Sequence, residues 1–333
     1  MTSPRAFIGL LLITFALSLG GCGKGSTQKA ETASPSAELA LANCEIVRHE
    51  AGETKICGQP QRVIALDPHA LDLLLALGVQ PVGYAEDQRA LMGSPKLGEP
   101  AVQVKYLGDR LTNQPTHVGT WQSPSLEAIV KLQPDLILGR IYDKSLYTNL
   151  SKISPTLFPE YSENDPWQDS IVTLGKVMDQ EQRAKQVIEQ HQQRLDKTTA
   201  ELAPISRDSK LLLLSMSGLD AIKAFTDETY AGSLLKDLGF QLVKPQLTTS
   251  SEINLSIETL PQLKADRIII MASGNTSVDK VKQSWQQNPI LRSLPASQAG
   301  QVYFVDYQLW SRIEGPISAE LMINQVRNLL RPG

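Results

Sequence analysis

Large aromatic residues and arginines stand near the ends of several apolar runs that read as buried strands. Arg140 directly follows the run "DLILG", and Arg312 comes soon after the run "VYFVD". Arginine offers permanently charged donors in a fixed geometry that suits carboxylates, and aromatic rings supply flat apolar contact. Together these residue types predict a site for a bulky, oxygen-rich, anionic ligand, although each has an ordinary alternative as sheet cover or a solvated strand end. The candidate ligand-binding residues are Trp121, Arg140, Tyr142, Phe225, Tyr230, Trp310 and Arg312.

Catalysis by a serine nucleophile is the main enzymatic alternative. Ser215 and Ser217 lie in "LLLLSMSGL", after a strand-like run. A nucleophile elbow needs glycine two places before and two places after the serine, and neither position fits fully. In that fold the histidine also follows the serine, whereas every histidine here precedes it, namely His49, His69, His117 and His191. We therefore expect no enzyme, and the serine hydrolase remains a distant alternative.

A bare metal ion is a closer alternative to the anionic ligand. His69 and His117 fall near predicted strand-to-helix loops, with Asp67 close to His69. A site would need three or four such ligands to converge, and the ordinary alternatives are a helix-start residue and a loop residue. The glycine-containing stretches "GSPKLG" and "MASGNTS" lack the spacing of a phosphate-binding loop. We expect no metal bound directly by the protein and no cofactor.

The elements that must position these residues alternate between strand and helix. The run "RVIAL" (62–66) leads to the helical stretch 69–78, and then to strand 79–84, helix "SLEAIVKL" and strand "DLILG". A second set holds strand 210–218, helix 230–239, short strand "FQLV", helix "SIETLPQL" and the strands "DRIIIMAS" and "QVYFVDY". Such alternation predicts an α/β fold of two lobes with mainly parallel sheets.

One phrase occurs in both halves of the chain. Residues 125–139 read "SLEAIVKLQPDLILG", and residues 256–270 read "SIETLPQLKADRIII". Each places a glutamate, Glu127 or Glu258, near the predicted start of a helix. We expect Ser123 and Asn254 to cap these helices, which would place each glutamate near the positive helix end. An apolar face formed by Leu126, Ile129, Val130 and Leu132 in the first phrase would leave its glutamate facing solvent.

The segment between the two sets is rich in Gln, Glu, Lys and Arg and has a thin apolar stripe. It predicts a rigid helix from about Gln180 to Leu202, roughly 33 Å long at 1.5 Å per residue. Two lobes joined by one long rigid helix would leave a ligand cleft between them. The expected parts are a signal peptide at 1–21, a lipidated flexible tether at 22–43, an N-terminal lobe at 44–168, connecting helices at 169–204 and a C-terminal lobe at 205–333.

The N-terminus has the pattern of an export signal. Arg5 precedes the apolar run "AFIGLLLITFALSLGG", which is too short for a comfortable membrane span. "LGGC" resembles a bacterial lipobox, in which Cys22 would carry the fatty-acyl (palmitate) anchor. The alternative is a soluble export signal in which this cysteine is incidental. The small polar residues that follow are typical of a tether.

The remaining cysteines, Cys44 and Cys57, flank a predicted hairpin. In an oxidising compartment a disulfide across it would stabilise the fold by roughly 3 kcal/mol at best. Two free thiols are the alternative, and the spacing is far from that of a metal-binding pair.

Composition sets broad limits. The 333 residues suffice for two domains, and 41% hydrophobic with 20% charged residues is typical of a globular protein. The net charge of −3, without a basic block, argues against a nucleic-acid partner.

Five stretches in order resemble the siderophore-binding lipoproteins of ABC importers, of the ferric-citrate and ferric-hydroxamate type that is related to cobalamin-binding proteins. They extend over most of the chain after residue 43 and are 60–85, 118–139, 232–240, 257–271 and 294–310. The resemblance implies a fold of two α/β lobes linked by a long helix, which delivers an iron chelate to a membrane permease and moves little on binding.

The resemblance also assigns roles to particular residues. It implies that Glu127 and Glu258 contact arginine pockets on the two permease subunits. Trp121 stands where a hydroxamate-binding relative has arginine, and Arg312 lies in a region where carboxylate-siderophore binders carry arginines. We therefore expect an exported, lipid-anchored, monomeric receptor of the cell envelope that binds an iron(III)–siderophore complex, with carboxylate or citrate-based types preferred. The alternative within the same fold is a cobalamin or haem binder.

Overall fold

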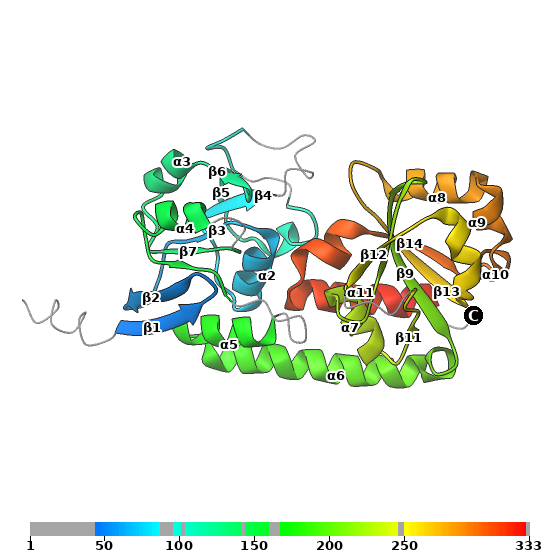
Figure 1. The fold of residues 1–333 in the computed structure, drawn as a ribbon. Coiled ribbons are helices and arrows are strands. Elements are labelled where there is room, and N and C mark those ends of the chain that lie inside the picture. The colour runs from blue at the N-terminus through cyan, green and yellow to red at the C-terminus, as the bar shows by residue number, and fades with distance from the viewer. Residues whose placement is uncertain are drawn as a thin grey trace, which may run out of the picture.

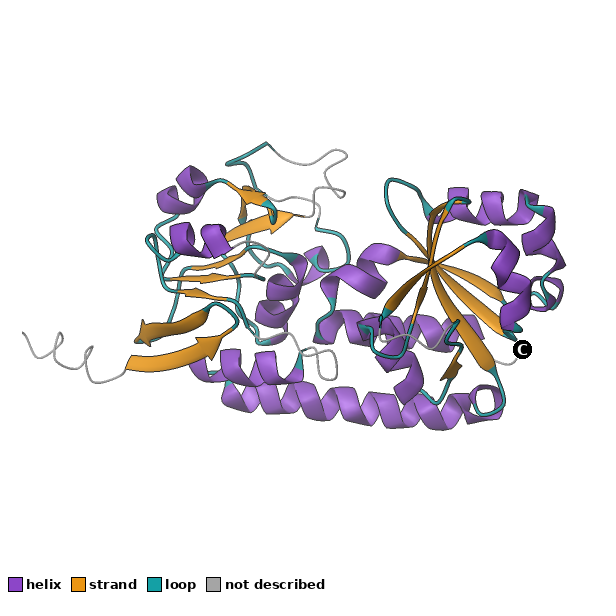
Figure 2. Ribbon diagram, viewed as in Figure 1, coloured by secondary structure: helices purple, strands orange, loops and turns teal. Residues whose placement is uncertain are grey.

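Two α/β lobes joined by a long helix make up the computed structural model (Figure 1). Figure 2 shows the helices and strands of both lobes by type. The N-lobe comprises β1 to β8 and the C-lobe β9 to α11, which confirms the predicted fold class. The structure describes residues 44–86, 96–100, 104–140, 144–159, 167–245 and 250–330.

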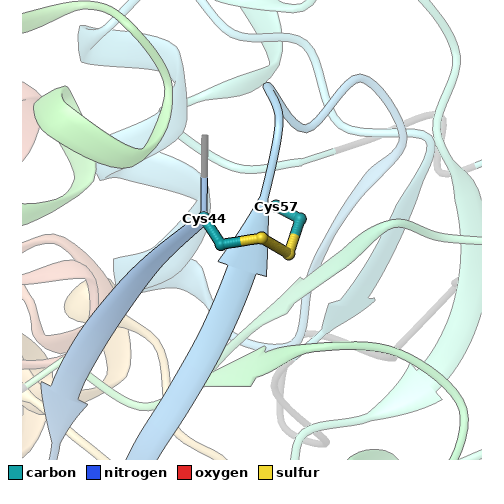
Figure 3. The surroundings of a disulfide bond; sticks show 2 residues. All are labelled: Cys44 and Cys57. Carbon is teal, nitrogen blue, oxygen red and sulfur yellow. A yellow bond between two sulfur atoms is a disulfide. The ribbon is translucent and has the colours of Figure 1, made fainter. Parts of the chain in front are cut away.

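The N-lobe begins with an antiparallel hairpin, β1 (Cys44–His49) and β2 (Gly52–Cys57). Its register sets Cys44 opposite Cys57, and the two form a disulfide (Figure 3). The Thr54 hydroxyl donates to the main-chain oxygen of Thr156 at 2.9 Å, which ties the hairpin to the lobe.

A six-stranded sheet of order β6-β5-β4-β3-β7-β8 forms the centre of the N-lobe. All neighbours are parallel except β5 and β6. Its central strands are continuous apolar runs because helices cover both faces. The strands are β3 (Val63–Ala65), β4 (Gly83–Glu86), β5 (Thr116–Thr120), β6 (Ser123–Pro124), β7 (Leu136–Leu138) and β8 (Thr156–Leu157).

Alternate residues of these strands face different helices. Val63 and Leu138 belong to the apolar cluster that includes α2, whereas Ile64 and Ile137 belong to the cluster beneath α3 and α4. Strand β4 begins later than predicted because the Val79 N–H bonds to Leu74 and closes the preceding helix. The helices of the lobe are α2 (Pro68–Ala76), the 3-10 turn η1 (Gly108–Arg110), α3 (Leu126–Lys131) and α4 (Lys144–Leu150).

Helix α2 has strong start and stop signals. Asp67 caps it by accepting from the Ala70 N–H at 2.8 Å, and Pro68 occupies its first position. Gly78 follows it at φ +80°, a conformation that glycine adopts at little cost. Every residue of α2 is buried because the helix lies between the N-lobe sheet and the C-lobe.

Helices α5 (Gln168–Val177) and α6 (Glu181–Ser206) connect the lobes. Helix α6 has 26 residues, which gives about 39 Å at 1.5 Å per residue, and it runs beneath both lobes (Figure 1). It extends past the predicted end and includes Pro204 in its last turn. Its buried side chains form the expected thin stripe.

A second six-stranded sheet forms the centre of the C-lobe, with order β12-β10-β9-β13-β14 and β11 beside β9. Strand β10 is antiparallel to its neighbours, a hairpin that the sequence reasoning missed, and the other pairs are parallel. The strands are β9 (Lys210–Gly218), β10 (Ala221–Phe225), β11 (Gln241–Leu242), β12 (Glu252–Leu255), β13 (Arg267–Ala272) and β14 (Val302–Asp306).

The C-lobe helices cover both faces of this sheet. Even-numbered residues of β9 and β13 pack towards α8 to α10, and odd-numbered ones towards α7 and α11. The predicted helix "SIETLPQL" is a 3-10 helix, because Pro261 inside it has no N–H to donate. The helical elements are α7 (Tyr230–Asp237), η2 (Ile257–Leu263), α8 (Val278–Gln287), α9 (Pro289–Ser293), α10 (Pro295–Gln298), the π-helical η3 (Leu309–Ile313) and α11 (Pro316–Leu330).

One apolar core joins the two lobes. It runs without interruption from Leu73 of α2 through Leu174 of α5 and Leu202 of α6 to Leu213 of β9 and Ile323 of α11. A core shared in this way resists separation of the lobes, because opening them would expose apolar surface.

Candidate functional site: a cavity between the lobes

A cavity of about 390 Å³ lies where β13 and β14 end, at the side of the C-lobe that faces the N-lobe. Loops after the carboxyl ends of parallel strands are the usual ligand sites of open α/β sheets. The N-lobe contributes Lys105, which forms an ion pair with Asp306 across the gap. The lining residues are Lys105, Ala272, Ser273, Gly274, Thr276, Ser277, Val278, Asp279, Asp306, Tyr307, Gln308 and Arg312.

Arg312 is the predicted ligand residue that lines this cavity. Its guanidinium lies over the Tyr307 ring, 5.1 Å from the ring centroid. Tyr307 in turn meets Phe225 edge-on, with centroids 6.4 Å apart. The stack limits the rotamers of the arginine and holds its charged guanidinium at the cavity wall.

The N-terminus of α8 provides a second feature that suits an anion. Ser277 caps the helix by accepting from the Lys280 N–H at 3.3 Å, and Ser277, Val278 and Asp279 all line the cavity. Backbone N–H groups at a helix start favour negative charge. Asp279 and Asp306 add negative charge to the lining, so the cavity wall carries charges of both signs.

Arg140 lies at the end of β7 and reaches the other lobe. Its Nη1 donates to the Glu314 carboxylate at 2.7 Å, and both side chains are mostly buried. Asp67 is also buried, which raises the pKa of its carboxyl, and the charge of Arg140 opposes that rise. Arg140 therefore has carboxylates from both lobes near it.

The histidines proposed for a metal have other surroundings. Burial, followed by the charge of Arg140, holds the pKa of His69 well below its ordinary value, and its Nδ1 donates to the Glu314 main-chain oxygen at 3.0 Å. Burial also lowers the pKa of His117. Within the described ranges, no group of three or more His, Cys, Asp or Glu side chains is arranged to hold a metal ion.

The other predicted ligand residues lie in different places. Phe225, Tyr230 and Trp310 are buried and are not among the cavity-lining residues. The Tyr230 hydroxyl donates to the Gly315 main-chain oxygen at 2.8 Å, and the Trp310 indole donates to Gln325 at 2.7 Å. Trp121 is half-buried in the turn between β5 and β6, and Tyr142 is outside the described residues.

Two lining residues were missed by the sequence reasoning. Tyr307 ends the run "QVYFVDY", so the rule that selected Trp310 and Arg312 could have selected it too. Lys105 lies in a loop of the N-lobe without a motif around it, and only the packing of the lobes brings it to Asp306.

The repeated glutamates lie on the surface of their lobes. Each is the second residue of its helix, after Ser125 in α3 and Ser256 in η2. The predicted caps Ser123 and Asn254 were wrong, because these residues belong to strands β6 and β12.

The predicted apolar face of α3 was only partly right. Ile129 is fully buried, but Leu126 and Val130 are 36% and 53% exposed. These two side chains therefore lie on the surface beside Glu127.

The electrostatic surroundings of the two glutamates differ. Lys131 donates to Glu127 at 2.8 Å and lowers the pKa of that carboxyl. For Glu258, its own backbone N–H and the Ser256 hydroxyl lower the pKa. Both carboxylates therefore stay ionised well below neutral pH.

No helix in the described parts of the chain is long and apolar enough to cross a membrane.

Comparison with known proteins identifies relatives along the whole chain. The Fe(3+)-citrate-binding protein YfmC of Bacillus subtilis (strain 168) is 30% identical over 325 residues, 96% of this chain and 95% of the relative. The Fe(3+) dicitrate-binding periplasmic protein FecB of Escherichia coli (strain K12) is 28% identical over 282 residues, 82% of this chain and 86% of the relative. These relatives are named as binding proteins rather than enzymes.

A solved structure agrees with this result. Staphylococcus aureus SirA, crystallised with staphyloferrin B, matches at a TM-score of 0.71 and 26% identity, covering 86% of this chain and 98% of SirA. The family described as periplasmic binding protein matches residues 63–309, and the chain belongs to that family.

Proposed function

We propose that this protein captures a ferric siderophore of the carboxylate or citrate-based type and delivers it to the permease of an ABC importer. The observation that carries the proposal is the interlobe cavity, in which Arg312 is stacked on Tyr307 beside the N-terminus of α8. A citrate-based iron(III) chelate is anionic and rich in oxygen, so it would use the charged donors of the arginine and the N–H groups of the helix. The names of YfmC and FecB support the same ligand class.

The predicted ligand residues differ in how directly they act on the ligand in this proposal. Arg312 contacts the ligand from the cavity wall, together with Tyr307 and Lys105, and Trp121 and Arg140 contribute from the N-lobe. Tyr142, which is outside the described residues, remains a further candidate. We assign Phe225, Tyr230 and Trp310 a supporting role, because all three are buried and Phe225 packs against Tyr307 of the cavity wall. The iron(III) is cargo held by the siderophore, and the protein supplies no metal ligand of its own.

Delivery requires a place to meet the permease. We assign this role to Glu127 and Glu258, since both are exposed, ionised and placed at equivalent positions in the two lobes. Opposite charges at the permease would set the orientation of the complex and its rate of formation. The protein would act as a monomer, held at the outer face of the membrane by acyl chains on Cys22, after removal of residues 1–21.

The ligand class is tested by titrating tryptophan fluorescence with ferric citrate, a ferric carboxylate siderophore, a ferric hydroxamate, haem and cobalamin. We expect saturable quenching with the first two. Tight binding of haem or cobalamin, with no response to the carboxylate chelates, would overturn the proposal.

The anchor is tested separately with Cys22→Ala in the host. We expect the variant to leave the membrane fraction, because lipidation depends on that thiol. Sedimentation equal to that of wild type would contradict the lipidation of Cys22.

A further inference from the structure

Helix α2 of the N-lobe carries a buried carboxylate that caps a helix of the other lobe. Both oxygens of Asp72 accept from backbone N–H groups at the start of α11, from Ile317 at 2.8 Å and from Ser318 at 2.8 Å. Asp72 has no exposed surface. A carboxylate at the start of a helix of 15 residues satisfies two N–H groups that have no partner within the helix, and it meets the positive end of the helix dipole.

The C-lobe is shaped to admit this carboxylate. A Cβ atom added to Gly315 would lie 2.4 Å from Asp72 Cγ, so any side chain at 315 would displace it. Around this point the Ser318 hydroxyl and the Gly315 backbone exchange hydrogen bonds, and the Tyr230 hydroxyl donates to the Gly315 oxygen. The buried polar atoms are thus paired, as a burial of this kind requires.

Three buried or mostly buried side chains of the N-lobe form hydrogen bonds with one short segment of the C-lobe, residues 314–318. His69 holds the main-chain oxygen of Glu314, Arg140 holds its carboxylate, and Asp72 holds the two N–H groups beyond. Glu314 itself has a left-handed backbone at φ +56°, which is unfavourable for a non-glycine residue and needs such support. This segment begins two residues after Arg312, at the wall of the cavity.

We infer that Asp72 is a positioning residue for ligand binding: by capping α11 from the opposite lobe, it fixes the direction in which Arg312 enters the interlobe cavity. The ligand part of this inference rests on the proposed function, whereas the cap itself does not. Asp72 touches no ligand and acts through the segment 312–318.

The chain contains a matched control. Asp135 also accepts from two backbone N–H groups, those of Gln61 at 2.7 Å and Arg62 at 2.8 Å, but all three residues belong to the N-lobe and lie at the surface. Asp72→Asn and Asp135→Asn therefore each remove a carboxylate that accepts from two backbone N–H groups. The first lies between the lobes, and the second lies within one lobe.

The first measurement needs no ligand. Burial outweighs the backbone hydrogen bonds and raises the pKa of Asp72 to about 7, so the work is done at pH 8 to keep the carboxylate ionised. We expect amide hydrogen exchange at Ile317 and Ser318 to rise at least tenfold in Asp72→Asn and to stay unchanged in Asp135→Asn. Unchanged exchange in both variants would overturn the inference, whatever ligand the protein binds.

The second measurement uses ferric citrate binding. Asp72→Asn should weaken it at least tenfold, and the effect should disappear in an Arg312→Ala background, because Asp72 acts through Arg312. Gly315→Ala should reproduce the loss from the other side of the contact, which keeps the test open if Asp72→Asn folds poorly. A loss of affinity that is equally large in Asp135→Asn, or additive with Arg312→Ala, would refute the positioning role. If wild type binds neither ferric citrate nor the ferric carboxylate siderophore, the proposed function fails, and hydrogen exchange still decides the cap.

Discussion

The N-lobe and the C-lobe use the same phrase of sequence and fold it differently. In the N-lobe "SLEAIVKL" forms the α-helix α3, so Lys131 stands one turn from Glu127 and pairs with it. In the C-lobe "SIETLPQL" forms a 3-10 helix around Pro261, and the residue four places after Glu258 is the neutral Gln262.

What the two phrases retain in common is the placement of the glutamate. Each carboxylate is exposed, occupies the second helical position after a serine, and has a pKa below its ordinary value through a different local partner. The two helices differ in type and in the partner of the glutamate, so a shared structural role does not explain why both lobes have an exposed acid at this position. The comparison indicates that the charge and its position are what the two lobes share, and it supports a contact with a partner that has two basic sites.

Charge reversal at both positions should have the largest effect. Glu127→Arg with Glu258→Arg should reduce uptake of radiolabelled ferric siderophore by roughly tenfold or more in cells that lack the wild-type copy, because like charges would face the permease. Fluorescence titration should give unchanged ligand affinity, since neither residue lines the cavity.

The control is a double reversal at two exposed glutamates elsewhere, Glu45→Arg with Glu189→Arg. It should transport normally. Normal transport by the Glu127 and Glu258 double variant at matched expression would mean that these residues serve only their helix starts.

The disulfide should stabilise the N-lobe more than the C-lobe. All cysteines precede residue 58, so only the N-lobe is cross-linked. Replacing both Cys44 and Cys57 by serine should lower the free energy of unfolding by roughly 3 kcal/mol at most, through the entropy of the unfolded loop. Hydrogen exchange should rise in β1 and β2 and stay constant in β13 and β14. An equal rise in both lobes would show that the shared core transmits the loss.

The two arginines of the lobes should differ in how they affect the ligand. Arg312→Ala should weaken binding of an anionic chelate roughly 10- to 100-fold, since charge-assisted hydrogen bonds contribute about 1.5–3 kcal/mol. Arg140→Ala should also weaken it, because the Glu314 carboxylate would lose its partner near the ligand.

Arg292→Ala, an exposed arginine of α9, is the control and should bind as wild type does. Unchanged affinity in both the Arg312 and Arg140 variants would move the ligand site away from this cavity.

The smallest effect concerns the ion pair between Lys131 and Glu127, which has no counterpart at Glu258 among the residues that the structure describes. In Lys131→Ala the pKa of Glu127 should rise towards its ordinary value, whereas that of Glu258 should not change, as measured by carboxyl NMR titration. A lowered pKa in the folded state contributes stability that is present above the ordinary pKa and lost as the pH falls through the folded pKa. The difference in melting temperature between wild type and variant should therefore shrink as the pH falls below the ordinary pKa of a glutamate, and vanish once the pH is below the lowered pKa of the folded state. A difference that persists there would assign the effect to packing.

Local patterns in the sequence were enough to predict the class of fold and the order of its parts. Alternation of apolar runs with helical stretches is a local signal, because strands covered on both faces must be apolar and helices must end at residues such as Gly78 and Gly239. The long helix α6 was predictable for the same reason, since its composition favours a helix over its whole length. The two glutamates were also found from local sequence, because the phrase repeats.

Details that depend on a single residue within a pattern were predicted less well. Pro261 changed a helix to the 3-10 form. The N-cap positions are Ser125, which accepts from the Ala128 N–H, and Ser256, which makes no capping bond, because the short strands β6 and β12 occupy Ser123 and Asn254. Strand pairing over these few residues outweighed the local capping preference.

Which side chains meet across the lobes depends on the folded arrangement and could not be predicted from the sequence. Lys105 reaches Asp306, Arg140 reaches Glu314, and Asp72 reaches the start of α11 from parts of the chain more than 170 residues apart. Trp310, a reasonable ligand residue by its position after a strand, is fully buried because η3 turns it into the shared core. These contacts depend on how the two lobes pack across α2, α6 and α11, and packing between distant elements leaves no periodic or spacing signal in a single sequence.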